Sequence, residues 1–262
     1  QYDLSETMQD GWVHSNTYCQ YPERQSISKV QEANNYHVNV APGETVECFV
    51  GNYRAPYFLL EKTNNQPNPV PTGTEVIYTL TLSVPEDSGR IYGKDCGGVE
   101  EFYLLAILQE GNADECDKPV KIVDLPPQGF NYAAGSWSAS SNLRGDLRAQ
   151  GITNDPEYNK IGTWILTNSD SGYLSPGEII TLTYKSVIAG DVLPGTYTNI
   201  ASAIGYTRSG EVILSNINEE NQTNPFVTSD VEVAAAGQVL GVSTLENTGD
   251  DIRLAVLMAS MV

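Results

Sequence analysis

Residues 74–84, TEVIYTLTLSV, decide the fold class, because apolar and hydroxyl side chains alternate along them. Side chains of a β-strand point alternately to its two faces, so the pattern predicts a strand with one face in a core and the other in water. Residues 178–187, EIITLTYKSV, have the same alternation. The residues predicted to face the core in these two strands are Val76, Tyr78, Leu80, Leu82, Val84, Ile180, Leu182 and Tyr184.

The whole chain is predicted to be all-β. Its 262 residues include 23 glycines, 14 prolines and 15 tyrosines, which is typical of β-sandwiches with many turns. No stretch has a sustained helical period of apolar residues. The pattern divides the chain into a module over 1–56, a second module over 57–232, and a linker over 233–249 that reads as a flexible tether. The last segment, 250–262, ends on the apolar run LAVLMASMV.

Charge and cysteine content limit the function classes. The net charge of −19 argues against nucleic-acid binding, because phosphates would be repelled. The four cysteines, at 19, 48, 96 and 116, form no C-x-x-C pair, so two disulfides in an oxidising compartment are favoured over a metal site. His14 and His37 are expected in polar loops without a nearby nucleophile, so no enzyme and no cofactor is predicted. The tryptophans Trp12, Trp137 and Trp164 are expected to be buried rather than to stack on sugars.

Three polar residues interrupt the apolar phase of predicted strands. Lys62 is in phase with Phe58 and Leu60, Asp124 is in phase with Val120 and Ile122, and Asn199 is in phase with Tyr197, Ala201 and Ala203. A charge on a core face costs several kcal/mol unless it is paired or neutralised. One interpretation is that each residue lies at a strand end and reaches solvent.

The alternative interpretation is that Lys62, Asp124 and Asn199 meet in the core and react. Burial favours the neutral, nucleophilic form of lysine and the protonated form of aspartate. The Lys62 amine would attack the Asn199 carboxamide, ammonia would leave, and Asp124 would shuttle protons. Fixed proximity would allow a single turnover that leaves an intramolecular isopeptide crosslink.

The second module resembles the bacterial surface-repeat family called "domain of unknown function 11". The resemblance is carried, in order, by LLEKTN, VPTGTEVIYTLTL, VKIVDLPPQGFNYAAGS, LSPGEIITLTYKSVIAG and LPGTYTNIASAIGYT, which together span about 57–232. It implies an Ig-like sandwich. The chain departs from the family pattern with an insert over about 85–119, in which Cys96 and Cys116 are expected to pair and 100–111 to add a strand. Such an insert is either a ligand-binding feature or decoration.

The first module resembles the end of a collagen-adhesin B-type, SpaA-like repeat of prealbumin fold. YDLSET, GW, Cys19 and VAPGETVECFVGN carry this resemblance. It implies that Glu6 assists an isopeptide bond to Asn52, although the strand that would supply the lysine is absent from the chain. A Cys19–Cys48 disulfide is expected as a substitute staple.

The C-terminal end resembles a sortase sorting signal of the Leu-Pro-x-Thr-Gly type. The motif residues are Leu245, Glu246, Asn247, Thr248 and Gly249. The resemblance implies cleavage between Thr248 and Gly249 and transfer of Thr248 to a cell-wall amine, with Glu246 standing where the family has proline. The apolar run over 254–262 is then expected to begin a truncated membrane span, and the chain to be a piece of a longer protein.

These expectations together describe tandem Ig-like and prealbumin-like modules of an extracellular, cell-wall-anchored stalk or adhesin. The expected partners are sortase and its amine acceptor, with a host protein or glycan as a further ligand. No nucleic acid is expected, and the membrane is met only through the C-terminal segment. A ligand-binding adhesin that uses the insert, a pilus-shaft subunit and an envelope enzyme are the alternatives.

Overall fold

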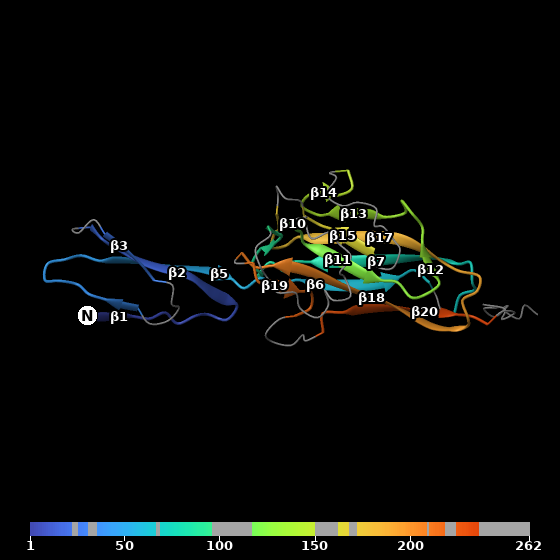
Figure 1. Cartoon of the computed structure of the whole chain (residues 1–262), viewed down its shortest axis with the longest axis horizontal. Helices are drawn as coiled ribbons and strands as arrows, with labels where there is room; N and C mark the ends of the chain where they lie inside the picture. Colours follow the sequence, from blue (N-terminus) through green and yellow to red (C-terminus); the bar gives the residue numbers. More distant parts are fainter. Residues whose placement is uncertain are drawn as a thin grey trace, which may run out of the picture.

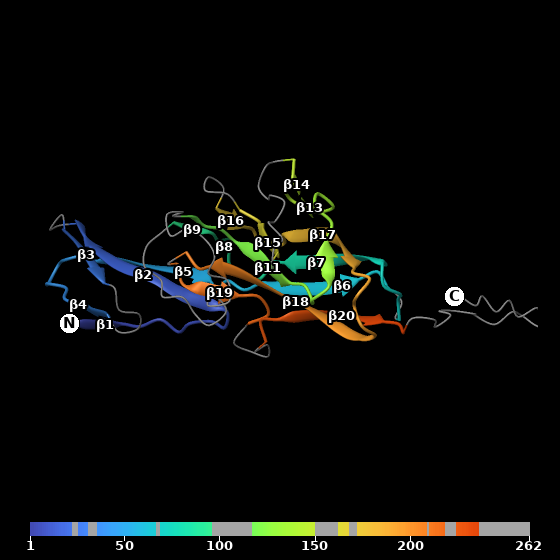
Figure 2. The same cartoon turned by 45° about the vertical axis from the view of Figure 1, so that its right-hand side comes forward.

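The computed structural model describes residues 1–22, 26–30, 36–66, 69–95, 117–149, 162–167, 172–208, 210–217 and 224–235. The regular elements of this part of the chain are β-strands without an α-helix, so the predicted all-β fold is confirmed. Accordingly, no helix that could cross a bilayer occurs among these residues. Two views show an elongated molecule with β1–β5 at one end and a larger β-structure at the other (Figures 1 and 2).

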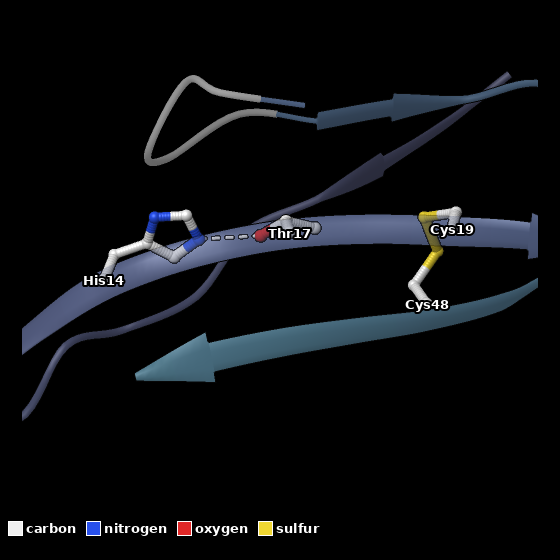
Figure 3. The surroundings of a disulfide bond; sticks show 4 residues. All are labelled: His14, Thr17, Cys19 and Cys48. Atoms are coloured by element: carbon white, nitrogen blue, oxygen red, sulfur yellow. Dashed lines mark hydrogen bonds between the residues drawn. A yellow bond between two sulfur atoms is a disulfide. The ribbon is translucent and has the colours of Figure 1, made fainter. Parts of the chain in front are cut away.

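The N-terminal part contains a three-stranded sheet of order β3-β2-β5 and a separate pair, β1-β4. The strands are β1 (Tyr2–Leu4), β2 (Trp12–Tyr21), β3 (Ser26–Val30), β4 (Tyr36–Val38) and β5 (Glu47–Arg54). Its core is small, with Cys19, Tyr21 and Val38 as buried residues. Cys19 and Cys48 lie directly opposite each other on β2 and β5 and form the expected disulfide (Figure 3). This staple supplements the limited apolar burial of a small module.

The larger part is built of two antiparallel sheets that share one core. The first sheet has the order β14-β13-β17-β7-β6, with β12 also paired to β17. Its strands are β6 (Leu59–Asn64), β7 (Glu75–Ser83), β12 (Phe130–Tyr132), β13 (Ser138–Ser141), β14 (Gly145–Asp146) and β17 (Ile179–Ile188).

The second sheet is organised around β18, which pairs with β11, β8, β19 and β20. Its strands are β8 (Ile91–Tyr92), β11 (Lys121–Leu125), β15 (Gly162–Ile165), β16 (Tyr173–Leu174), β18 (Gly195–Tyr206), β19 (Val212–Leu214) and β20 (Val227–Val233). The strand β20 thus continues one residue past the predicted end of the second module.

The predicted strand phase is confirmed. In β7 and β17 every residue assigned to the core face is buried, and the intervening threonines are partly exposed. The two strands are neighbours in register, with Leu80 opposite Leu182 and Tyr78 opposite Tyr184. Alternating burial of this kind places one face of the first sheet against the second sheet.

The first part of the predicted insert belongs to the core. The strand β8 pairs with β16 and β18, and Ile91 is fully buried. The interpretation of the insert as decoration is therefore wrong for these residues. β9 (Lys94–Asp95) pairs with β10 (Asp117–Lys118), whereas Cys96, Cys116 and the strand expected within 100–111 lie outside the described residues.

Gly205 allows β8 to approach β18 closely. A Cβ atom added to Gly205 would lie 2.3 Å from Ile91 Cγ2 and 3.5 Å from Phe58 Cε1. We therefore expect Gly205→Ala to lower the free energy of unfolding by about 1–3 kcal/mol, the usual cost of overpacking a core. Gly190→Ala is the matched control, because a Cβ there meets nothing within 4 Å. Denaturant unfolding measures both, and equal stability of the two variants would contradict the close packing.

Candidate crosslinking site

Lys62, Asp124 and Asn199 meet inside the sandwich. Lys62 lies on β6 of the first sheet, whereas Asp124 and Asn199 lie on the neighbouring strands β11 and β18 of the second. The side chains of Lys62 and Asp124 are 0% exposed, and Asn199 is also fully buried. The interpretation that each residue reaches solvent at a strand end is therefore wrong.

A fourth residue, Tyr184, connects the three. Lys62 Nζ donates a hydrogen bond to Asp124 Oδ2 at 2.5 Å, and Tyr184 Oη donates to the same oxygen at 2.7 Å. Asn199 Nδ2 in turn donates to Tyr184 Oη at 2.7 Å. These four residues, named the buried cluster below, form an unbroken chain of hydrogen bonds from the lysine amine to the asparagine amide.

Aromatic rings enclose the buried cluster. Lys62 Nζ lies 5.0 Å from the centre of the Tyr78 ring and 5.8 Å from that of Tyr184. Trp164 packs against Tyr184 with ring centres 4.9 Å apart. The rings offer the amine a weak cation–π attraction but no bulk water, so a charged lysine there depends on Asp124 for compensation.

The surroundings favour the neutral forms of Lys62 and Asp124. Burial lowers the pKa of Lys62 from its ordinary value, and the attraction and hydrogen bond of Asp124 only partly oppose this. Burial likewise raises the pKa of Asp124, and the charge of Lys62 and the hydrogen bonds from Lys62 and Tyr184 only partly oppose this. An uncharged amine is the nucleophilic form, and a protonated carboxyl can donate a proton.

The structure also brings together the second predicted pair. Asn52 Nδ2, on β5, donates a hydrogen bond to Glu6 Oε1 at 2.5 Å. Glu6 is partly buried, whereas Asn52 is exposed. The pair has the juxtaposition that the resemblance implies, and a crosslink at Asn52 stays a prediction.

Several other sequence predictions fall on described residues. Trp137 and Trp164 are buried as expected, but the prediction is wrong for Trp12, which is 36% exposed on β2 with Arg54 over its ring at 5.0 Å. The loop placement of the histidines is also wrong. His14 lies on β2 and hydrogen-bonds Thr17 (Figure 3), and His37 lies on β4 beside Asp3. The sorting motif at 245–249 and the segment 250–262 lie outside the described residues.

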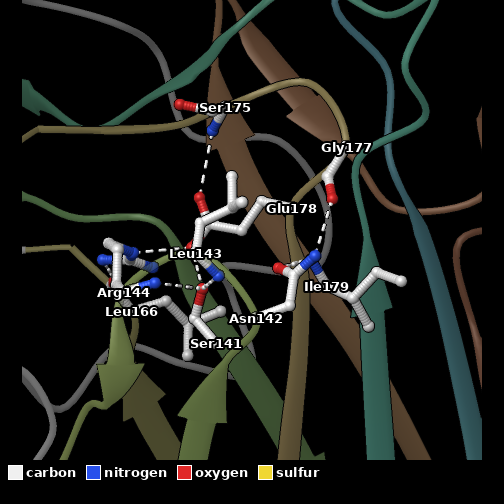
Figure 4. A network of polar contacts seen from close by, with 9 residues as sticks. All are labelled: Ser141, Asn142, Leu143, Arg144, Leu166, Ser175, Gly177, Glu178 and Ile179. Atoms are coloured by element: carbon white, nitrogen blue, oxygen red, sulfur yellow. Dashed lines mark hydrogen bonds and ion pairs between the residues drawn. The ribbon is translucent and has the colours of Figure 1, made fainter.

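A second buried polar network was not predicted. Glu178, which precedes β17, is almost fully buried and accepts hydrogen bonds from Arg144 Nε at 2.6 Å and Ser141 Oγ at 2.7 Å (Figure 4). The backbone N–H of Ser175 donates to the other carboxylate oxygen of Glu178, and Arg144 Nη1 donates to the Leu166 carbonyl. These contacts pair the Glu178 carboxylate with the Arg144 guanidinium, and they connect the turn after β13 to the turn before β17. The network holds the fold and contains no lysine nucleophile.

The comparisons with known proteins give weak likenesses only. No protein-family model and no curated protein matches the chain. Solved structures that are similar include the collagen-binding subdomain Ace19 of an Enterococcus faecalis surface protein, with 14% identity, a TM-score of 0.38, and coverage of 68% of this chain and 97% of that chain. A collagen-binding domain from a Staphylococcus aureus adhesin has 10% identity, a TM-score of 0.35, and coverage of 68% and 98%.

Domains D2 and D3 of the major pilin SpaD from Corynebacterium diphtheriae are also similar. The identity is 15%, the TM-score is 0.38, and the match covers 64% of this chain and 51% of that chain. TM-scores in this range do not establish a common fold. The function is therefore inferred from the side-chain geometry of the buried cluster.

Proposed function

We propose that the chain is a structural stalk or adhesin segment of an extracellular surface protein, braced by an isopeptide bond between Lys62 and Asn199. The observation that supports this most is the buried cluster itself. A lysine, a carboxyl group and an asparagine amide lie in one hydrogen-bonded chain, away from water. Fixed proximity in a dry site can supply much of the barrier reduction that a single-turnover reaction needs.

The proposed reaction joins the Lys62 amine to the Asn199 side chain. Neutral Lys62 Nζ attacks Asn199 Cγ, so the Nζ–Cγ bond forms and the carbonyl oxygen takes up electron density. The Asp124 carboxyl shuttles protons between the attacking nitrogen and the leaving nitrogen. The Cγ–Nδ2 bond then breaks, one proton has passed from the attacking to the leaving nitrogen, and ammonia departs. The product has lost one NH₃, and the Lys62 nitrogen is now part of an amide, which cannot take up a charge in the buried site.

The position of the crosslink suits a load-bearing role. β6 is the first strand of the larger part and lies at the edge of its sheet, where β7 is its one partner among the described strands. An edge strand at the point where the chain enters is the element that tension would peel away first. A covalent link to β18, the central strand of the other sheet, would carry tension from Lys62 to Asn199 and bypass the strands between them.

Attachment to the cell surface completes the proposed function. Sortase would cleave between Thr248 and Gly249 and join Thr248 to a cell-wall amine. This part of the proposal is supported by the sequence resemblance of 245–249 alone. Because Glu246 stands where the motif has proline, the experiment must show whether a sortase accepts this sequence. Incubation of the chain with a sortase and a labelled amine should label the wild type, and a Thr248→Ala variant should stay unlabelled.

Intact-mass spectrometry tests the proposed crosslink. We expect the wild-type chain to be lighter than its sequence by one ammonia, after correction for disulfides. Lys62→Ala should show its full sequence mass because the nucleophile is gone. Lys185→Ala is the matched control, since that lysine is 43% exposed in a surface ion pair with Glu75 and should leave the ammonia loss unchanged. A wild-type chain of full mass would refute the crosslink.

A further inference from the structure

We infer that Tyr184 is a further catalytic residue of the crosslinking reaction, which relays a proton from the attacking nitrogen to the leaving nitrogen. This inference rests on the proposed function. Its basis is the position of the Tyr184 hydroxyl, which contacts both Asp124 Oδ2 and Asn199 Nδ2 at 2.7 Å. The hydroxyl therefore lies between the group that faces the amine and the nitrogen that must leave.

The reaction itself requires such a transfer. When neutral Lys62 Nζ bonds to Asn199 Cγ, the attacking nitrogen holds one proton more than the amide product needs. The leaving Nδ2 holds one fewer than ammonia needs. Within the buried cluster, the described contacts join these two nitrogens through Asp124 Oδ2 and the Tyr184 hydroxyl in turn.

The relay can be written with every proton accounted for. In the tetrahedral intermediate Nδ2 is no longer conjugated with the carbonyl, so its lone pair becomes basic. The Tyr184 hydroxyl, which accepts a hydrogen bond from Nδ2 before the attack, can then donate its proton to Nδ2. Asp124, which begins protonated, gives its proton to the tyrosine oxygen and takes the surplus proton of Nζ. Tyr184 and Asp124 end as they began, the Cγ–Nδ2 bond breaks, and neutral ammonia leaves.

Burial favours a relay through side chains over one through water. Lys62, Asp124, Tyr184 and Asn199 are all fully or almost fully buried, so water has little access as a proton carrier. A hydroxyl can accept one proton and donate another without becoming charged, which suits a site of low polarity. General acid–base catalysis by a positioned side chain contributes about 10²–10⁴-fold to a rate.

Tyr78 provides a matched control. It lies directly opposite Tyr184 on β7, is equally buried, and its ring centre is 5.3 Å from that of Tyr184. Its hydroxyl is near the Asn199 amide but makes no well-formed hydrogen bond with a described residue. A hydroxyl that does not join Asp124 to Asn199 cannot relay the proton, although its removal disturbs the same core.

The test is a time course of ammonia loss. Full-length wild type, Tyr184→Phe and Tyr78→Phe are made by cell-free synthesis, quenched in acid denaturant at intervals, and weighed intact. We expect Tyr184→Phe to lose ammonia about 100-fold more slowly than wild type, the effect of removing a general acid–base group. Tyr78→Phe should react within a few-fold of the wild-type rate.

Two further measurements separate chemistry from packing. Both tyrosine substitutions are repeated in an Asn199→Ala chain, which cannot form the crosslink, so that unfolding reports the packing cost alone. The wild-type reaction is also followed in D₂O, where a proton relay should slow it measurably. A relay predicts the solvent isotope effect whether or not Tyr184→Phe folds well, and its absence would overturn the inference.

The outcomes distinguish the inference from the function on which it rests. If Tyr184→Phe reacts as fast as Tyr78→Phe, the relay is wrong while the crosslink stands. If the wild type never loses ammonia, the proposed function itself is wrong. Slow reaction of Tyr184→Phe, with equal packing costs for the two tyrosine variants, supports the relay.

Discussion

Asp124→Ala is expected to retain its full sequence mass and to be less stable than an Asn199→Ala chain by about 3–5 kcal/mol, the cost of leaving one partner of a buried pair alone. The Asn199→Ala chain is the proper reference, because it also lacks the crosslink but keeps the Lys62–Asp124 pair. Without Asp124, the Lys62 amine loses its hydrogen-bond acceptor in a site with 0% exposure. Intact mass and urea unfolding measure the two effects.

This loss of stability should depend on pH in a defined direction. Burial lowers the pKa of Lys62, and removal of Asp124 removes the interactions that oppose this shift. The unfolded chain then binds a proton at Lys62 that the folded chain does not, so stability rises as the pH approaches the ordinary lysine pKa of 10.5. The penalty of Asp124→Ala should therefore shrink from neutral toward alkaline pH.

Asp191→Ala provides the control for Asp124→Ala. Asp191 is exposed in the turn between β17 and β18, so its removal should change stability by no more than about 0.5 kcal/mol. It should also leave the ammonia loss intact. Loss of ammonia by Asp124→Ala at the wild-type rate would remove Asp124 from the mechanism.

Glu178→Ala is expected to lower the free energy of unfolding by about 3 kcal/mol, near the lower end for breaking a buried ion pair. The Glu178 side chain is 2% exposed and that of Arg144 is 19% exposed, so the remaining guanidinium keeps some access to water. Ser141 and the Ser175 backbone N–H also lose an acceptor. The variant should nevertheless form the crosslink, because no residue of the buried cluster is altered.

The surface pair Lys185–Glu75 is the comparison for Glu178→Ala. Both side chains are nearly half exposed, at 43% and 48%, so Glu75→Ala should cost at most about 1 kcal/mol. Denaturant unfolding of both variants in the Asn199→Ala chain gives the comparison without the crosslink. Equal losses would show that the Glu178 network contributes no more than a surface ion pair.

The alternation of apolar residues predicted the core of the larger part. Side chains of a β-strand alternate between its two faces, so one apolar residue fixes which of its neighbours share the core face. Lys62, Asp124 and Asn199 were therefore placed on core faces from the sequence, and all three are buried. Phase alone could not decide whether they meet or reach solvent at strand ends, because that depends on how the two sheets are stacked. The pairing of β11 with β18, and the position of β6 on the facing sheet, decide it.

Tyr184 and Glu178 show what strand phase leaves out. The alternation correctly predicts Tyr184 in the core. The hydrogen-bond partners of its hydroxyl, Asp124 and Asn199, come from β11 and β18 of the opposite sheet. Most buried tyrosine hydroxyls have a hydrogen-bond partner, and this is the one signal that could have linked Tyr184 to Asp124. Glu178 precedes its strand in a Pro-Gly turn, a setting typical of exposed residues, and is buried because Arg144 approaches from a distant turn.

The N-terminal part was harder to predict at the level of single side chains. Its sheets are small, so a strand residue such as Trp12 can remain 36% exposed while Cys19 is buried. The alternation of apolar residues is weak there, and the polar surroundings of His14 and His37 predict loops although these residues lie on β2 and β4. The Cys19–Cys48 disulfide is expected from the family resemblance. The two cysteines can bond because they lie directly opposite each other on the paired strands β2 and β5.

Peptide mapping of the wild-type protein tests the central claim most directly. After digestion, tandem mass spectrometry should find a branched peptide in which Lys62 is joined to Asn199 and whose mass is lower than the sum of the two linear peptides by one ammonia. Recovery of the two peptides as separate linear species, with a free Lys62 amine and an intact Asn199 amide, would contradict it.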